Sequence, residues 1–117
     1  MNGTFLLLLA LLAVAGNRQQ QPDGKAVFET KGNCFVCHGK DAKGTVLAPN
    51  LTDPQWLNVD GSLEQITALI SKGVPKPKKA PAPMPAMGGA KLSKDEIDAV
   101  ARYVVSLSAP PAEAARK

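Results

Sequence analysis

Cys34-Phe35-Val36-Cys37-His38 is the segment on which the fold of this 117-residue chain depends. Its C-x-x-C-H pattern is the attachment signature of a c-type haem, in which two cysteine thiols add to the two vinyl groups of the porphyrin. The two residues between the cysteines let the backbone make one turn, so both sulfurs face the same porphyrin edge. The adjacent histidine is then delivered to one axial position of the iron. The chain has no other cysteine and no other histidine.

Three other chemistries use parts of this pattern. A structural zinc site takes four Cys or His ligands, and this chain offers three. A thioredoxin-type C-x-x-C needs a strand and a helix in a βαβ unit, and no strand pattern flanks Cys34. A disulfide between Cys34 and Cys37 in an exported protein stays open here, although it leaves His38 without a role. The motif therefore favours haem attachment, through Cys34 and Cys37, with His38 as an iron ligand.

The first residues predict export. Residues 5–15 form an apolar run that ends in Ala13-Val14-Ala15, the A-x-A cleavage pattern of a secretory signal peptide. The run is shorter than the about 20 apolar residues that span a bilayer. No Lys or Arg precedes it, so retention as a short anchor also stays open. The expected location is the periplasm or another site of export, with contact to a membrane only through a partner complex or an uncleaved N-terminal segment.

The expected domain organisation is simple, because 117 residues allow one small domain. A domain of this size commonly needs a metal, a disulfide or a cofactor to complete its core. The net charge of +4 is modest and aromatic residues make up only 4%, so a nucleic-acid partner is not expected. We expect the following division: signal peptide, residues 1–15; polar leader, 16–22; folded domain, 23–108; flexible tail, 109–117.

The hydrophobic pattern predicts three short helices and no strands. Asp23 is a predicted N-cap, and Gly32 is expected at C′, just beyond the end of the helix that follows. Ser62 and Ser93 each begin a capping box, with Gln65 and Glu96 three residues later. Between these helices the chain is rich in Gly, Pro, Asn and Asp, and residues 74–85 contain five prolines, which excludes helix there. Such short helices and long loops need an organising group, and a haem inserted among them supplies one.

A haem iron bound by His38 has a second axial position, for which Met84, Met87, water or an empty site are the candidates. Pro83 and Pro85 flank Met84, so its backbone is stiff. A thioether is a neutral ligand at any ordinary pH, and His/Met ligation raises the reduction potential. We therefore expect Met84 as the second ligand, with Met87 as the fallback. A filled coordination sphere suits electron transfer and opposes substrate binding.

Taken in order, these segments resemble class I mono-haem c-type cytochromes. The resemblance covers residues 23–107 and rests on C-F-V-C-H, on Ala48-Pro49-Asn50-Leu51, on M-P-A-M-G-G from Met84, and on the last helix. It implies an all-α cytochrome c fold: three or four short helices and long loops wrapped around one covalently attached haem c. It also implies that the carbonyl of Pro49 accepts a hydrogen bond from His38. In the crossing of the first and last helices, it implies contacts of Gly24 and Phe28 with Val100 and Tyr103, although Tyr103 as a plain surface residue stays open.

Residues 51–57, LTDPQWL, are similar to a segment in cytochrome c domains of haem–copper oxidases. Trp56 is then either a donor to a haem propionate or a core aromatic residue, and both interpretations stay open.

The stretch before Met84 departs from the family, because it is longer and more basic than the expected link. Four lysines cluster there: Lys72, Lys76, Lys78 and Lys79. They form either a solvated loop or a docking surface for redox partner proteins with an acidic surface, since clustered charge speeds encounter.

The expected function is one-electron transfer outside the cytoplasm, shuttling between respiratory or dehydrogenase partners, without substrate chemistry by the protein itself. The alternative is a haem-bearing electron-transfer subunit of a larger membrane-associated oxidoreductase complex. An open-site haem enzyme or sensor, and a thiol protein without haem, are further rivals.

Overall fold

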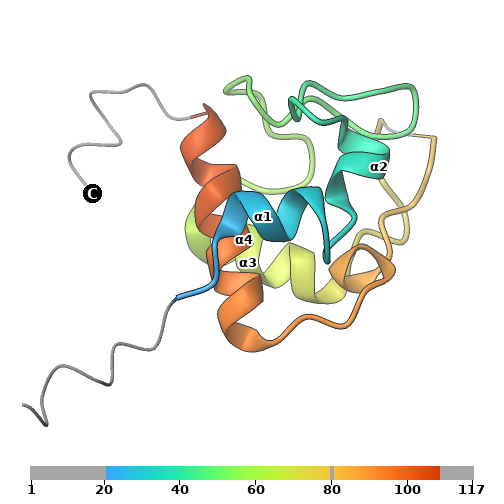
Figure 1. The fold of residues 1–117 in the computed structure, drawn as a ribbon. Helices are drawn as coiled ribbons and strands as arrows, with labels where there is room; N and C mark the ends of the chain where they lie inside the picture. The colour runs from blue at the N-terminus through green and yellow to red at the C-terminus, as the bar shows by residue number, and fades with distance from the viewer. Residues whose placement is uncertain (1–20, 80, 109–117) are drawn as a thin grey trace, which may run out of the picture.

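The computed structural model of the chain describes residues 21–79 and 81–108. The predicted signal peptide and tail, and most of the polar leader, lie outside these residues. The described elements are, in order, α1 (Gly24–Glu29), α2 (Cys34–His38), α3 (Leu63–Lys72), the 3-10 helix η1 (Ala86–Gly89) and α4 (Lys94–Ser108) (Figure 1). Within the described ranges, β-pairing is limited to a single isolated bridge. The prediction of an all-α fold with short helices is confirmed.

The helices begin where their capping residues predict. Asp23 accepts hydrogen bonds from the backbone N–H groups of Lys25 (3.0 Å) and Ala26 (3.5 Å). The first helix, however, ends earlier than the sequence predicts. Thr30 is its C-cap, and Gly32 lies in the following turn, where its N–H donates to the carbonyl of Val27 at 2.8 Å. The position of Gly32 therefore placed the end of α1 one residue too far along the chain.

The two predicted capping boxes form to different extents. Ser93 and Glu96 make both reciprocal bonds: Glu96 N–H donates to Ser93 Oγ at 3.1 Å, and Ser93 N–H donates to Glu96 Oε1 at 2.9 Å. At α3 only one half forms. Gln65 N–H donates to Ser62 Oγ at 3.3 Å, while the Gln65 side chain accepts from Asp60 N–H instead. The start of α4 is thus the more firmly fixed.

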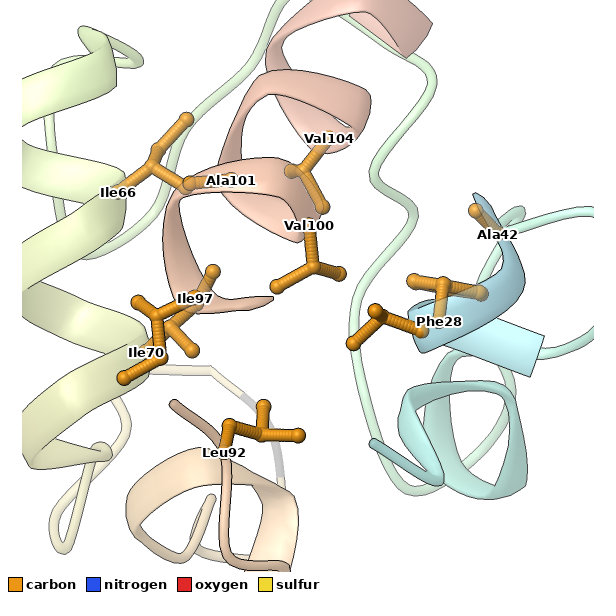
Figure 2. Close-up of a cluster of buried hydrophobic side chains, with 10 residues drawn as sticks. Phe28, Ala42, Ile66, Ile70, Leu92, Ile97, Val100, Ala101 and Val104 are labelled. Carbon is orange, nitrogen blue, oxygen red and sulfur yellow. The ribbon is translucent and has the colours of Figure 1, made fainter. Parts of the chain in front are cut away.

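The core lies between α1, α3 and α4. Figure 2 shows the side chains of α4 between those of α3, which contributes Ile66 and Ile70, and Phe28 of α1. Phe28 and Val100 are fully buried. Burial of a Val or Phe side chain of this kind stabilises the fold by about 1.5–3 kcal/mol. Leu92 and Ile97, which flank the start of α4, are also buried, as expected of a hydrophobic staple.

The predicted crossing of the first and last helices is confirmed. A Cβ atom built on Gly24 would overlap the carbonyl oxygen of Ala99 and lie 2.8 Å from Cβ of Tyr103, so the two backbones meet at this glycine. The rings of Phe28 and Tyr103 pack edge to face, with centroids 5.5 Å apart and planes at 67°. Tyr103 is therefore a packing residue of the crossing.

The remaining half of the domain is made of loops and α2. Figure 1 shows α2 and residues 74–79 and 81–85 on the same side of the molecule, away from the crossing of α1 and α4. The isolated bridge joins Val74 and Met84, whose backbones exchange hydrogen bonds of 2.8 and 3.0 Å. This pairing closes the proline-rich segment at its base and fixes the backbone of Met84.

Candidate haem-binding site

The C-x-x-C-H motif forms its own single-turn helix, α2. The preceding residue, Asn33, takes the left-handed conformation (φ 54°), which turns the chain sharply out of the α1 loop. Residues three apart share one side of a helix, so Cys34 and Cys37 point the same way. Both cysteines are free thiols. They are thus placed to act together on one ligand.

A cavity of about 420 Å³ lies against this side of α2. Its wall comes from three segments: α2, the loop around Pro49, and the proline-rich segment around Met84. The predicted site residues that line it are Cys34, Cys37, His38, Pro49 and Met84. Much of the rest of the wall is apolar, including Val36, Leu47 and Val74. Segments far apart in the sequence therefore converge on one largely apolar space.

His38 is held in a single tautomer. The side chain is only 9% exposed, and its Nδ1 lies 2.9 Å from the carbonyl oxygen of Pro49. A carbonyl only accepts, so Nδ1 carries the proton and Nε2 keeps a free lone pair. Burial lowers the pKa of His38 below its ordinary value of 6.5, and the hydrogen bond to Pro49 opposes this shift. The imidazole is therefore neutral at neutral pH, which is the form that binds a metal.

The electrostatics of Cys34 differ from those of a thiol redox centre. Burial raises the pKa of its thiol; a backbone hydrogen bond opposes this, and the neighbouring Cys37 adds to it. Reactive cysteines of thiol oxidoreductases have a lowered pKa, because the thiolate is the nucleophile. Cys34 therefore lacks the lowered thiol pKa that is typical of a thiol–disulfide exchange centre.

The two candidate methionines occupy different environments. Met84 is half-buried and lines the cavity, with its backbone fixed by Val74. Both methionines pack against the core, but Met87 has a left-handed backbone conformation (φ 54°), and its Sδ accepts a hydrogen bond from Leu92 N–H at 3.5 Å. Met87 is not among the residues that line the cavity. The geometry favours Met84 over Met87 as the residue that faces a bound ligand.

Asn58 lies in the cavity wall and Trp56 does not, although the sequence singles out Trp56 and not Asn58. The Trp56 ring lies over Gly61 and packs against the core, and it is not part of the cavity wall. Its contact with a haem propionate stays a prediction. Asn58 does line the cavity, and its Oδ1 accepts from Lys78 N–H at 3.4 Å. No sequence motif marks Asn58, because its position depends on the path of an irregular loop.

The four clustered lysines are all exposed. Lys72 ends α3, and Lys76, Lys78 and Lys79 belong to the loop that the Val74–Met84 bridge closes. Three of the four therefore sit on the loop that leads to Met84, a residue of the cavity wall.

The residues around the cavity fit a haem of the c type. Two thiols one helical turn apart match two vinyl groups, a neutral histidine offers Nε2, and a thioether comes from a different segment of the cavity wall. The apolar wall suits a porphyrin face. The fold and the site together are those of a small all-α protein suited to hold a covalently attached metalloporphyrin.

Comparison with known families agrees with this class. The family model described as cytochrome c matches residues 22–108. The chain belongs to the cytochrome c family, and membership implies a covalently bound haem c. The expected cytochrome c fold is thereby confirmed.

Several curated relatives carry the same kind of domain. The chain is 36% identical over 99 residues to the cbb3-type cytochrome c oxidase subunit CcoP of Rubrivivax gelatinosus, and the match covers 85% of this chain and 30% of the relative. It is 45% identical over 91 residues to the subunit FixP of Bradyrhizobium sp. (strain ORS 278), covering 75% and 30%. It is 47% identical over 88 residues to a CcoP subunit of Rhodobacter capsulatus, covering 72% and 28%.

The chain thus spans about 30% of the length of the curated relatives it matches. No solved structure matches it. Among residues 21–79 and 81–108, no helix is both long and apolar enough to cross a membrane.

Proposed function

We propose that this chain is a haem-bearing electron-transfer unit of a larger membrane-associated oxidoreductase complex of the cbb3 oxidase kind. The observation that carries the proposal is the convergence of Cys34, Cys37, His38 and Met84 on one cavity. The relatives are named as oxidase subunits, and this favours a complex subunit over the expected freely shuttling carrier. The freely diffusing carrier becomes the second candidate.

Each residue of the site has its own proposed role in holding one haem c. Cys34 and Cys37 would form the thioether links, His38 Nε2 and Met84 Sδ would bind the iron, and the Pro49 carbonyl would orient the imidazole. The bound haem would supply one-electron exchange between ferric and ferrous iron. Binding of both His38 and Met84 to the iron would oppose the binding of a substrate there. The domain that does this comprises residues 23–108, on the outer side of the cytoplasmic membrane.

The ligand assignment is tested by absorption spectra of wild type, Met84→Ala and Met87→Ala. We expect wild type and Met87→Ala to show a low-spin ferric haem with the sulfur-to-iron band in the red. Met84→Ala loses that band, because the thioether that lines the cavity is gone. Met87→Ala is the matched control, since it removes a thioether of the same size three residues away. Loss of the band in Met87→Ala alone contradicts the assignment, and a high-spin wild-type spectrum favours an open-site haem protein.

Haem attachment and assembly have their own tests. A haem stain on a denaturing gel is positive if the thioethers form, and a negative result supports a thiol protein without haem. Native electrophoresis of detergent-solubilised membranes from the source cells then separates the two functional candidates. A haem-stained band that co-migrates with oxidase activity supports the subunit. Recovery of the whole haem-stained chain alone from the soluble fraction contradicts it.

The exposed lysine loop is the proposed contact for an acidic partner surface. Lys76, Lys78 and Lys79 lie on the loop closed by Val74 and Met84, so a partner bound there approaches the cavity that holds the redox centre. Clustered charge near such a site speeds encounter and makes it depend on salt.

A further inference from the structure

Thr45 links the motif helix to the loop that carries Pro49. Its hydroxyl donates to the carbonyl oxygen of Cys37 at 2.5 Å and accepts from Leu47 N–H at 3.0 Å. The backbone N–H of Thr45 donates to the carbonyl of Ala48, also at 3.0 Å. One residue therefore ties the last turn of α2 to the residues immediately before Pro49.

The preceding residue, Gly44, makes the same connection through its backbone. Its N–H donates to the carbonyl of His38 at 2.8 Å. A Cβ atom at Gly44 would lie 2.7 Å from the backbone nitrogen of Asn50 and 2.9 Å from the carbonyl carbon of Pro49. The loop thus passes directly over the end of α2, and the Thr45 hydroxyl is the side-chain group of the loop that bonds to the α2 backbone.

We propose that Thr45 is a positioning residue that holds the Pro49 carbonyl on His38 Nδ1 and thereby sets the donor strength of His38 as an iron ligand. The inference rests on the proposed ligation by His38. A hydrogen bond from the far ring nitrogen makes a metal-bound imidazole a stronger electron donor. A stronger donor favours ferric over ferrous iron and lowers the reduction potential. Loosening the Pro49 carbonyl therefore raises the potential.

The role of Thr45 is separable from its contribution to folding. Its side chain is exposed, so substitution leaves no cavity in the core. What changes on removing the hydroxyl is the geometry of the loop between Cys37 and Pro49. The effect therefore belongs to the ligand field of the iron and not to the packing of the helices.

The test compares Thr45→Val and Thr45→Ser with a matched control, Thr30→Val. Thr30 is also exposed, and its hydroxyl donates to the carbonyl of Ala26 at 2.5 Å at the end of α1, so it loses the same kind of bond elsewhere. Two quantities are measured on the haem-loaded proteins. The first is the midpoint potential, and the second is the exchange rate of the His38 Nδ1 proton by NMR in the diamagnetic reduced state.

We expect Thr45→Val to raise the midpoint potential and to speed exchange of the Nδ1 proton. Thr45→Ser keeps a hydroxyl at this position and is expected to behave as wild type. Thr30→Val is also expected to behave as wild type in both measurements. The inference is overturned if Thr45→Val matches Thr30→Val in both measurements, or if Thr45→Ser shifts as Thr45→Val does. Thr45→Ala takes the place of Thr45→Val if the valine variant does not load haem, and the same outcomes apply.

Failure of this inference is distinct from failure of the proposed function. An unresponsive Thr45→Val in a protein with a normal low-spin wild-type spectrum removes only the role of Thr45. A wild-type chain without covalent haem overturns the proposed function itself.

Discussion

Gly24 is the residue at which two helices meet with no side chain between them. Its Cα faces the carbonyl of Ala99 and the Cβ of Tyr103. Two effects oppose each other on substitution by alanine. Helix propensity favours alanine by up to about 1 kcal/mol, whereas overpacking a tight contact costs about 1–3 kcal/mol or more. The added methyl group would overlap a backbone oxygen, which cannot relax by a rotamer change, so overpacking wins.

We therefore expect Gly24→Ala to lower the free energy of unfolding by about 1–3 kcal/mol. Urea unfolding of the haem-loaded protein, followed by circular dichroism, measures this. Lys25→Ala is the control, because it places alanine at an exposed position of the same helix and leaves the crossing untouched. A Gly24→Ala protein that is more stable than wild type rules out the close crossing of α1 and α4.

At the scale of the elements, the start of α4 is held by one carboxylate with two partners. Glu96 accepts from Ser93 N–H at 2.9 Å and pairs with Lys31 Nζ at 2.7 Å, which joins the loop after α1 to α4. The hydrogen bond from Lys31 comes first among the causes that lower the pKa of Glu96 from 4.5 to about 2, followed by the bond from Ser93. A carboxyl whose pKa is lower in the folded state stabilises the fold when it is ionised.

The stability contributed by the Glu96 charge is therefore fully present above about pH 4.5 and is lost as pH falls toward about 2. We expect Glu96→Gln to be less stable than wild type at pH 7, with a difference that shrinks over this acid range. Denaturant unfolding at a series of pH values between neutrality and the folded-state pKa measures it. Asp98→Asn is the control, because Asp98 pairs with Arg102 on an exposed face of the same helix. A difference that is constant with pH, or that grows on acidification, contradicts the assignment.

At the scale of the whole molecule, the domain has a helical frame on one side and a cavity with its loops on the other. The frame holds the core, while α2 and the loops around Pro49 and Met84 surround the cavity. The loop closed by the Val74–Met84 bridge carries three exposed lysines on the cavity side. The electrostatic field on the cavity side of the molecule therefore depends on the charges of Lys76, Lys78 and Lys79.

We expect neutralisation of these three lysines to glutamine to slow oxidation of the reduced protein by ferricyanide, an anionic oxidant. Charge steering of association is worth about 10-fold or more at low ionic strength, and much of it should disappear with the cluster. The difference fades at about 1 M salt, where the screening length is about 3 Å. A triple variant at Lys25, Lys91 and Lys94 is the control of equal charge, away from the loop. Equal rates for the two triple variants at low salt contradict a steering role.

Much of this architecture is predicted by residues that lie close together in the sequence. The C-x-x-C-H motif predicts α2 and its cavity-facing thiols, and Ser93 with Glu96 predicts the start of α4, because capping involves residues only three apart. The crossing at Gly24 follows from resemblance, and Met84 is predicted from the prolines on either side of it. These predictions depend on neighbours in sequence or on a known pattern.

What the sequence does not predict depends on contacts between distant loop residues. Asn58 reaches the cavity, and Trp56 turns away to Gly61, although both lie in the same irregular stretch. Thr45 acquires its importance from Cys37, eight residues earlier, which no periodicity reveals. Backbone groups in loops without a repeat find partners only once the fold is complete.

The bridge between Val74 and Met84 has one further consequence, for how such a domain can diversify. The backbone pairing holds Met84 from the base of the loop, and the exposed Lys76, Lys78 and Lys79 between the two bridge positions do not line the cavity. Lengthening a surface loop costs little, about 0.6 kcal/mol for each doubling. Residues added beside these lysines, and changes in their charge, can therefore be accommodated without moving the backbone of Met84. Mutations of the exposed lysines and mutations of the residues that line the cavity thus fall on separate positions and can accumulate independently.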